Sequence, residues 1–195
     1  MKFLKTKFLE TMKFLKTPWG EVLITVLIAL IVFAGVRVTL QSFIVRQQSM
    51  EPSFHDGQYI LANKLTYHFS SPKRGDVIIF HYPLNPSELY IKRVIGLPGE
   101  RVEIVNGRVY IDEGKGSGFQ LLEEPEYIPS IDYQMSPTPV LPPDEYFVLG
   151  DNRNNSSDSH VWGTVPRENI IGKTWLRYWP PSKWGLSPSY SFTLQ

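Results

Sequence analysis

Residues 101–112 read RVEIVNGRVYID, two short runs rich in β-branched residues that are joined by Asn106 and Gly107. Asparagine followed by glycine is a strong signal for a two-residue hairpin turn, because both residues tolerate positive φ. The stretch therefore predicts a β-hairpin. Similar runs, punctuated by glycine and proline, lie at 57–65, 76–82, 90–96 and 145–151. Together these runs predict a mostly β fold.

Two stretches interrupt this pattern. Residues 113–144 carry acids, glycines and six prolines, a composition that favours a loop-rich insertion over core. Residues 180–195 are rich in proline and serine, so we expect a loosely packed C-terminal tail.

The composition excludes several classes of function. The 195 residues carry a net charge of +1 and no cysteine. The balanced charge argues against a nucleic-acid binder, and the lack of cysteine excludes thiolate metal sites and a cysteine nucleophile. Four dispersed histidines without a His-Glu-x-x-His spacing argue against a metalloprotease. We therefore expect no metal, no cofactor and no nucleic-acid partner.

An apolar run near the N-terminus, VLITVLIALIVFAGV at 22–36, predicts a membrane-spanning helix over 20–42. About 20 apolar residues cross a bilayer core. A buried core helix is the alternative, but a helix that is apolar all round rarely suits so small a domain. A cleaved secretory signal is a second alternative. The run exceeds a usual signal core and no small-x-small site follows it, which favours an uncleaved anchor.

Residues 1–19 are predicted to form a basic cytoplasmic tail. Five lysines precede the apolar run, so the positive-inside rule predicts a single-pass protein with its N-terminus in the cytoplasm. MKFLKT occurs at 1–6 and again at 12–17, and the spacing of eleven places both copies on one helical face. The sequence then predicts a basic amphipathic helix that lies on anionic lipid. Its apolar stripe, beside the lysines, would be formed by Leu4, Phe8, Met12 and Leu15. The alternative is a solvated tail that only directs topology.

Histidine-based serine chemistry has no local support. The chain has no Gly-x-Ser-x-Gly motif, and no motif selects a triad partner among its four histidines, His55, His68, His81 and His160. We expect each of them to be a surface or hydrogen-bonded residue.

Lysine offers another route to an activated serine. Strand alternation places Lys92 on one face with Tyr90 and Val94. Burial of this face would lower the lysine pKa from its usual value of about 10.4 and leave a neutral amine that can act as a base. The alternative is an edge-strand lysine in solvent.

Three motifs in order carry a family resemblance: SMEP at 49–52, YIKRVIGLPGE at 90–100 and GDNRNNSSDSHVWG at 150–163. With the N-terminal anchor, they closely resemble type I signal peptidases, membrane-bound Ser/Lys endopeptidases that remove signal peptides. The resemblance covers nearly all of 43–175. It implies a mostly β fold shared with self-cleaving repressors and an extracytoplasmic catalytic domain over 43–179.

The same resemblance implies roles for individual residues. Ser49 matches the family nucleophile and Lys92 the general base. Ser156 would donate or accept a hydrogen bond with the base, and Asp158 would help order the site. Asp151 and Arg153 match supporting polar residues.

One position departs from the family pattern. The oxyanion requires donors, of which the backbone N–H of Ser49 is one. Many relatives supply a serine hydroxyl two residues earlier, where this chain has Gln47. The Gln47 amide could donate instead, or the backbone could act with another group.

Cleavage after small-x-small sequences requires narrow pockets. The resemblance assigns the S1 and S3 pockets to eight residues: Phe43, Val45, Met50, Phe54, Ile60, Ile79, Tyr90 and Ile91. Ordinary β core is the alternative. An extended substrate could lie as an added strand beside 89–92 and the segment before Ser49.

The reactive serine is expected near the membrane. About eight residues separate the predicted span from Ser49, a reach of at most about 29 Å. Four aromatic residues are candidate interfacial anchors, with aromatic core as the alternative: Phe43, Trp175, Trp179 and Trp184. We expect a monomer in a bacterial cell membrane, in contact with lipid and close to the secretion translocon.

Two other functions remain open at this stage. One is a non-catalytic, membrane-tethered β module in envelope assembly. The other is a Ser/Lys peptidase that matures a specialised pilin or conjugation substrate.

Overall fold

The computed structural model describes residues 17–188, 190 and 192–195. The chain divides into two compact units, Met1–Thr39 and Leu40–Gln195. The predicted amphipathic stripe and the first MKFLKT copy fall within 1–16, outside the described residues.

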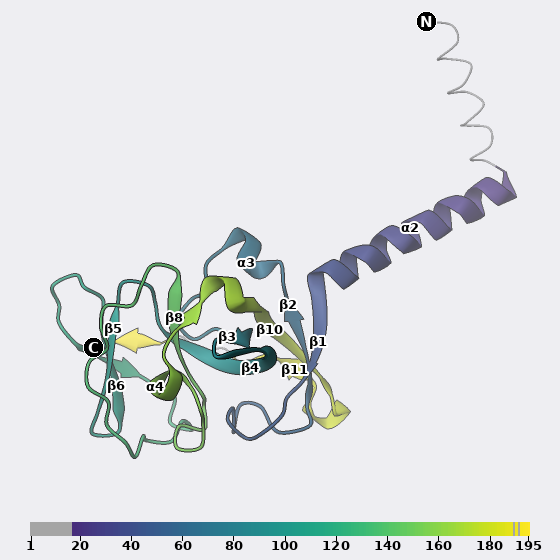
Figure 1. Ribbon diagram of the computed structural model, residues 1–195. Coiled ribbons are helices and arrows are strands. Elements are labelled where there is room, and N and C mark those ends of the chain that lie inside the picture. Colours follow the sequence, from purple (N-terminus) through teal and green to yellow (C-terminus); the bar gives the residue numbers. More distant parts are fainter. Residues whose placement is uncertain (1–16, 189, 191) are drawn as a thin grey trace, which may run out of the picture. The chain divides into compact units, whose positions relative to one another are not determined.

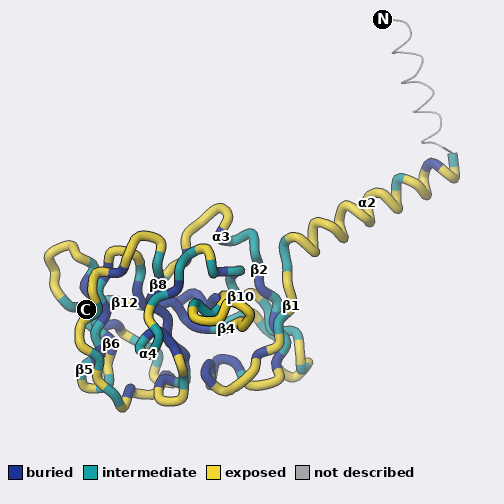
Figure 2. The backbone as a smooth tube through the Cα atoms, in the orientation of Figure 1, coloured by how far each residue is buried: buried dark blue, intermediate teal, exposed yellow. Residues whose placement is uncertain are grey.

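Helix α2, Pro18–Thr39, forms the described part of the first unit. It begins where Thr17 Oγ1 accepts a hydrogen bond from the N–H of Gly20. Glu21 in the first turn and Arg37 in the last suit the helix dipole. Its 22 residues are long and apolar enough to cross a membrane, and residues 21–38 are exposed (Figure 2) apart from the half-buried Ile24. An apolar helix is therefore present where the sequence predicts one, and it ends at Thr39 rather than at 42.

The larger sheet of the second unit has eight strands, all paired antiparallel (Figure 1). Its order is β1 (Leu40–Ile44), β2 (Tyr59–Asn63), β10 (Ile170–Trp179), β3 (Val77–Tyr82), β4 (Asn85–Gly96), β8 (Glu145–Leu149) and β9 (Val165–Pro166), and β11 (Gly185–Leu186) adds to β10.

The smaller sheet has four strands in the order β12 (Thr193–Leu194), β7 (Gln120–Glu123), β6 (Arg108–Asp112) and β5 (Arg101–Val105). The predicted hairpin is confirmed: β5 pairs with β6, and φ is 49° at Asn106 and 79° at Gly107. Short helical segments occupy connections, namely α3 (Thr66–Phe69), α4 (Ser159–Trp162), η1 (Arg167–Asn169) and η2 (Pro181–Lys183).

Period-two alternation builds the core. In β2 and β5, buried and half-buried residues alternate, so each strand presents one apolar face inward. The end of β4 is buried on both faces because apolar clusters lie on either side of it: Ile95 packs in one and Val94 in another. A third cluster, which includes Val45, Met50 and Phe54, anchors the chain between β1 and β2.

The stretch 113–144 is loop-rich as predicted, with β7 as its one named strand, but it is not excluded from the core, because four of its apolar residues are buried: Leu122, Ile128, Ile131 and Leu141. The expectation of a loosely packed tail was wrong, because the stretch 180–195 pairs with both sheets, through β11 on β10 and β12 on β7. Strands β7 and β12 belong to the smaller sheet, and β11 belongs to the larger one. Composition alone does not indicate any of these pairings.

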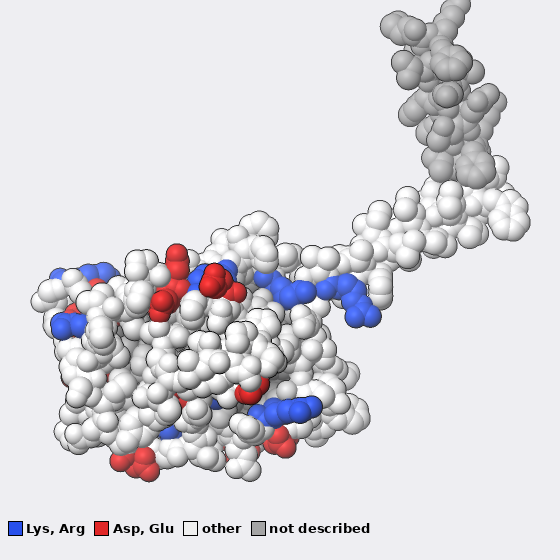
Figure 3. All heavy atoms as spheres, in the orientation of Figure 1, with Lys and Arg blue, Asp and Glu red and all other residues white. Residues whose placement is uncertain are grey.

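The surface of the second unit carries both signs of charge. On the face shown in Figure 3, acidic and basic side chains are interspersed, and neither sign gathers into a large patch. Three tryptophans are exposed rather than buried in an aromatic core: Trp175, Trp179 and Trp184.

Candidate active site

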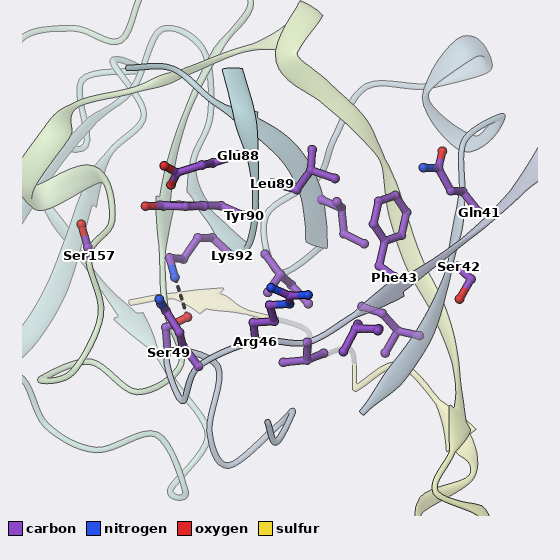
Figure 4. A pocket seen from close by; sticks show the side chains of 16 residues that line it. Gln41, Ser42, Phe43, Arg46, Ser49, Glu88, Leu89, Tyr90, Lys92 and Ser157 are labelled. Atoms are coloured by element: carbon purple, nitrogen blue, oxygen red, sulfur yellow. Dashed lines mark hydrogen bonds between the residues drawn. The ribbon is translucent and has the colours of Figure 1, made fainter. Parts of the chain in front are cut away.

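A cleft of about 610 Å³ lies between two segments of the larger sheet, residues 41–47 with Ser49 on one side and residues 88–92 of β4 on the other (Figure 4). β1 is an edge strand. Residues 85–92 of β4 pair with β3 alone, because β8 joins β4 only from Arg93 onward. Two unpaired strand edges therefore line the cleft.

The loop after β1 holds Ser49 at the cleft. The N–H of Val45 donates to Gln58 O, and the N–H of Gly57 donates back to Val45 O, so both ends of the loop are fixed. Within it, the N–H of Phe54 donates to Met50 O. Met50 and Phe54 are fully buried, and they anchor the backbone beside Ser49 in the core.

Lys92 reaches Ser49 from β4. Its Nζ lies 2.6 Å from Ser49 Oγ, as the dashed line in Figure 4 marks. Only 4% of Lys92 and 8% of Ser49 are exposed. Burial removes water from the ammonium and lowers the pKa of Lys92 to about 8, and the nearby Asp158 and Asp151 carboxylates oppose this shift. A substantial fraction of this amine is therefore neutral near pH 8.

Asp151 and Arg93 form a wholly buried ion pair behind the dyad. Arg93 Nε and Nη2 donate to the two carboxylate oxygens of Asp151 at 2.7 and 2.5 Å. Both side chains are fully buried. Such a bidentate pair fixes both partners in direction as well as distance. Since Arg93 follows Lys92 on β4, the pair also fixes that strand beside the dyad.

Asp158 and Arg153 organise the loop after β8. Asp158 accepts the N–H of Gly150 at 2.9 Å, caps helix α4 and lies 2.6 Å from Nδ1 of His160. Arg153 donates to Gly150 O at 3.0 Å and pairs with Glu124. These contacts hold the loop against Ser49, whose carbonyl accepts the N–H of Asn152 at 3.1 Å.

Ser156 does not make the expected hydrogen bond with Lys92. Its Oγ is buried and has no hydrogen-bond partner among the described residues. Ser156 instead packs on Gly150, where an added Cβ would lie 2.2 Å from the Oγ. Gly150 is therefore required for this close packing. The adjacent Ser157 lines the cleft.

Most of the residues predicted for substrate pockets do line the cleft. Six of the eight are found there, Phe43, Val45, Ile60, Ile79, Tyr90 and Ile91. Met50 and Phe54 are not among its lining residues, because both point into the core as loop anchors. Gln47 also lines the cleft. Glu88 and Arg46 also line the cleft, and their exposed positions give no signal in the sequence.

No histidine contacts Ser49 in the described part of the chain. His160 pairs with Asp158 and stacks on Tyr133, with ring centroids 4.3 Å apart. The expectation of a hydrogen-bonded residue therefore holds for His160. Among the described residues, no three side chains of the metal-binding types are grouped to hold a metal ion.

The chain matches known proteins over most of its length. Residues 19–179 match the family model for signal peptidase, peptidase S26. A signal peptidase I of Leptolyngbya laminosa is 43% identical over 90% of this chain and 88% of its own. A probable signal peptidase I-1 of Synechocystis is 39% identical over 85% of this chain and 87% of its own.

A more distant relative comes from a plant. The thylakoidal processing peptidase 1 of Arabidopsis thaliana, a chloroplast protein, is 36% identical over 69% of this chain and 41% of its own. The extent of these matches settles the family, and the Ser49–Lys92 contact lies in its matched region. The chain belongs to the signal peptidase family, peptidase S26, of serine endopeptidases.

Proposed function

We propose that this chain removes signal peptides from preproteins with Ser49 as nucleophile and Lys92 as general base. The observation that carries the proposal is the 2.6 Å separation of Lys92 Nζ and Ser49 Oγ, both of which belong to buried side chains at the cleft. A serine hydroxyl is a weak nucleophile unless an adjacent base removes its proton. Buried, neutral Lys92 supplies that base.

The reaction follows from this contact. Ser49 Oγ attacks the scissile carbonyl carbon while its proton moves to Nζ of Lys92. The resulting ammonium protonates the leaving amine nitrogen as the C–N bond breaks. Water then attacks the acyl carbon while Lys92 accepts its proton, and the lysine ammonium returns that proton to Ser49 Oγ as the ester C–O bond breaks and the carboxylic acid product leaves. A lysine pKa of about 8 suits both proton transfers, because the group can accept and return a proton near neutral pH.

Oxyanion stabilisation is assigned to the loop before Ser49. The backbone N–H of Ser49 donates to no other protein group in the described chain, so it is free to bind the oxyanion. Gln47 has φ of 71°, and its own N–H donates to Asp56 Oδ1 at 2.8 Å. This contact fixes the backbone of Gln47 in the left-handed region at the cleft. Its side-chain amide, unpaired among the described residues, is the second proposed donor.

Substrate recognition uses the two free strand edges. An extended peptide placed between β1 and residues 85–92 of β4 would pair with both backbones. Apolar residues fill the cleft floor, including Val45, Ile60 and Ile79. They leave room for small side chains before the scissile bond and favour small-x-small sites.

Helix α2 is proposed to anchor the enzyme once in the cell membrane, with residues 1–19 cytoplasmic and the sheets outside. The apolar, exposed helix and the lysines that precede it support this orientation. The exposed Trp175, Trp179 and Trp184 would contact the interface. We expect a monomer near the translocon. Protease added to spheroplasts should remove residues 40–195, and their complete protection would contradict the orientation.

The test of function is direct. Purified full-length protein in detergent is incubated with a preprotein, and the new N-terminus of the product is sequenced, with Ser49→Ala in parallel. We expect a single cut after a small-x-small sequence by the natural chain and none by the variant. A non-catalytic module would leave the preprotein intact. A specialised peptidase would cut only a pilin or conjugation precursor.

A further inference from the structure

The C-terminal strap, residues 185–195, closes over the ion pair behind the dyad. It is described apart from residues 189 and 191. The match to the family model ends at residue 179, so this strap lies beyond the residues that the model matches. Its contacts must therefore be interpreted from this chain's own structure.

Tyr190 is the point of closest contact between the strap and the ion pair. Its ring covers the Arg93 guanidinium, with Cζ 3.9 Å from the ring centroid. Its hydroxyl accepts a hydrogen bond from Arg93 Nη2 at 2.8 Å and lies 2.6 Å from Ser53 Oγ. The same hydroxyl donates toward Asp151 Oδ2 at 3.4 Å. One side chain thus contacts both ion-pair partners and the loop that carries Ser49.

Backbone pairing on both sides holds Tyr190 in place. Before it, β11 pairs with β10, and the N–H of Ser187 donates to Trp175 O at 2.8 Å. After it, β12 pairs with β7, and Gln195 and Leu121 exchange two backbone hydrogen bonds. The strap therefore bridges the larger and the smaller sheet, with Tyr190 between its two attachments.

We propose that Tyr190 is a positioning residue for the Ser49–Lys92 dyad, acting through Arg93 on the side of Lys92 and through Ser53 on the side of Ser49. This inference rests on the proposed function. Arg93 is the next residue after Lys92, and Ser53 lies four residues after Ser49 on the same anchored loop. Arg93 Nη2 also reaches Ser53 Oγ directly, but only at 3.5 Å, whereas the Tyr190 hydroxyl joins the same two groups at 2.8 and 2.6 Å.

Loss of Tyr190 would expose the Arg93 guanidinium to water. A buried ion pair is stabilising only while its hydrogen bonds are complete and water is excluded. Without the tyrosine, Arg93 loses its cover and one hydrogen-bond acceptor, and Ser53 Oγ keeps only the 3.5 Å contact with Arg93 Nη2. The two segments that meet at Lys92 and Ser49 would then be held together less firmly, which lowers the fraction of enzyme with the two groups in contact.

A change in charge balance at Lys92 would accompany this movement. The carboxylates that face Lys92 are Asp151, paired with Arg93, and Asp158, paired with His160. Water around Arg93 would weaken its hold on Asp151, whose carboxylate then favours the charged lysine. The acid limb of the pH–rate profile would therefore move to higher pH.

The experiment compares Tyr190→Phe and Tyr190→Ala in the full-length enzyme in detergent, with Tyr110→Phe as the matched control. Tyr110 lies on β6, and its hydroxyl makes no hydrogen bond in the described part of the chain. The measurements are kcat and KM for preprotein cleavage, the pH dependence of kcat/KM, and the thermal midpoint.

We expect Tyr190→Phe to lower kcat several-fold and Tyr190→Ala to lower it by about tenfold or more, which corresponds to a lost hydrogen bond to a charged group. KM should stay within about twofold, because Tyr190 does not line the cleft. The acid limb should move to higher pH in Tyr190→Ala, and Tyr110→Phe should match the natural chain.

Natural kcat and an unshifted pH profile in both Tyr190 variants would overturn the proposal. So would a loss of activity that only follows the loss of folded protein, with the pH profile of the folded fraction unchanged. Failure of the proposed function is a separate result, since it requires cleavage by Ser49→Ala.

Discussion

Lys92 Nζ and Ser49 Oγ meet at 2.6 Å although 43 positions separate them in the chain. The loop after β1 brings the hydroxyl, and β4, paired with β3, brings the amine. Each is held by buried neighbours, Met50 beside the serine and Arg93 beside the lysine. In the mechanism that we propose, this preorganised pair activates the serine without a histidine.

Replacement of Lys92 by methionine should stabilise the fold while abolishing cleavage. Burial lowers the lysine pKa to about 8 from 10.5, so below pH 8 the folded chain must carry a poorly solvated ammonium. By proton linkage, the lowered pKa reduces the free energy of unfolding by about 3 kcal/mol at most.

The sign of the pH effect is also fixed. Between pH 8 and 10.5 the unfolded chain binds more protons than the folded one, so the natural protein gains stability as pH rises. The advantage of Lys92→Met in thermal midpoint should therefore be largest below pH 8 and should shrink toward pH 10.5. A variant that is less stable at pH 7 would contradict burial of the lysine.

Replacement of Asp158 by asparagine should move the acid limb of kcat/KM to lower pH. The Asp158 carboxylate favours the charged lysine and raises its pKa, so removing the charge lowers that pKa further. Thermal stability should fall as well, because Asp158 caps α4 and accepts the N–H of Gly150. Asp132→Asn, at an exposed position, serves as the control. A shift to higher pH would refute this electrostatic account.

Replacement of Gln47 by alanine should lower kcat and leave KM nearly unchanged. An oxyanion donor acts in the transition state, and removing one costs roughly 10² to 10³ in kcat in a well-studied serine protease. Gln47→Ser, which restores a hydroxyl donor, should recover part of the loss. Equal kcat in Gln47→Ala and the natural chain would show that the amide does not donate, and the Ser49 N–H would then act with another group.

Alanine replacement of each histidine should leave the enzyme active. The described hydrogen bonds join none of them to Ser49, and His55, His68 and His81 lie outside the lining of the cleft. His160→Ala removes the partner of Asp158 and should alter the pH profile rather than abolish turnover. A folded but inactive His160→Ala enzyme, checked by circular dichroism, would restore a histidine mechanism.

Two structural elements could be predicted because short stretches of sequence determine them. The Asn106–Gly107 turn and the apolar helix 18–39 depend on short stretches of sequence, and both occur. Strand β10 was not predicted, because its alternation is broken by bulges and its burial depends on β2 and β3 on either side. Tertiary pairing, rather than propensity, makes it a central strand.

The candidate site was predictable only in part for a similar reason. Motif resemblance selected Ser49 and Lys92, which the structure brings into contact, but it also led to a Ser156 hydrogen bond that the described residues do not contain. Met50 and Phe54 were assigned to pockets because apolar residues beside a nucleophile look alike in sequence whether they line a cleft or anchor its loop. Arg93 and Tyr190 are 97 positions apart in the chain, so no local sequence pattern predicts their contact.

The most direct test of the account follows acylation of Ser49 as a function of pH. A peptide ester that ends in a small-x-small sequence is mixed with the full-length enzyme, and intact-mass and peptide mapping locate the acyl group and its rate of formation. We predict acylation on Ser49 alone, with a rate that rises through a single proton loss near pH 8, and none in Lys92→Met. Acylation of another residue, or acylation of Ser49 at the natural rate in Lys92→Met, would contradict the central claim.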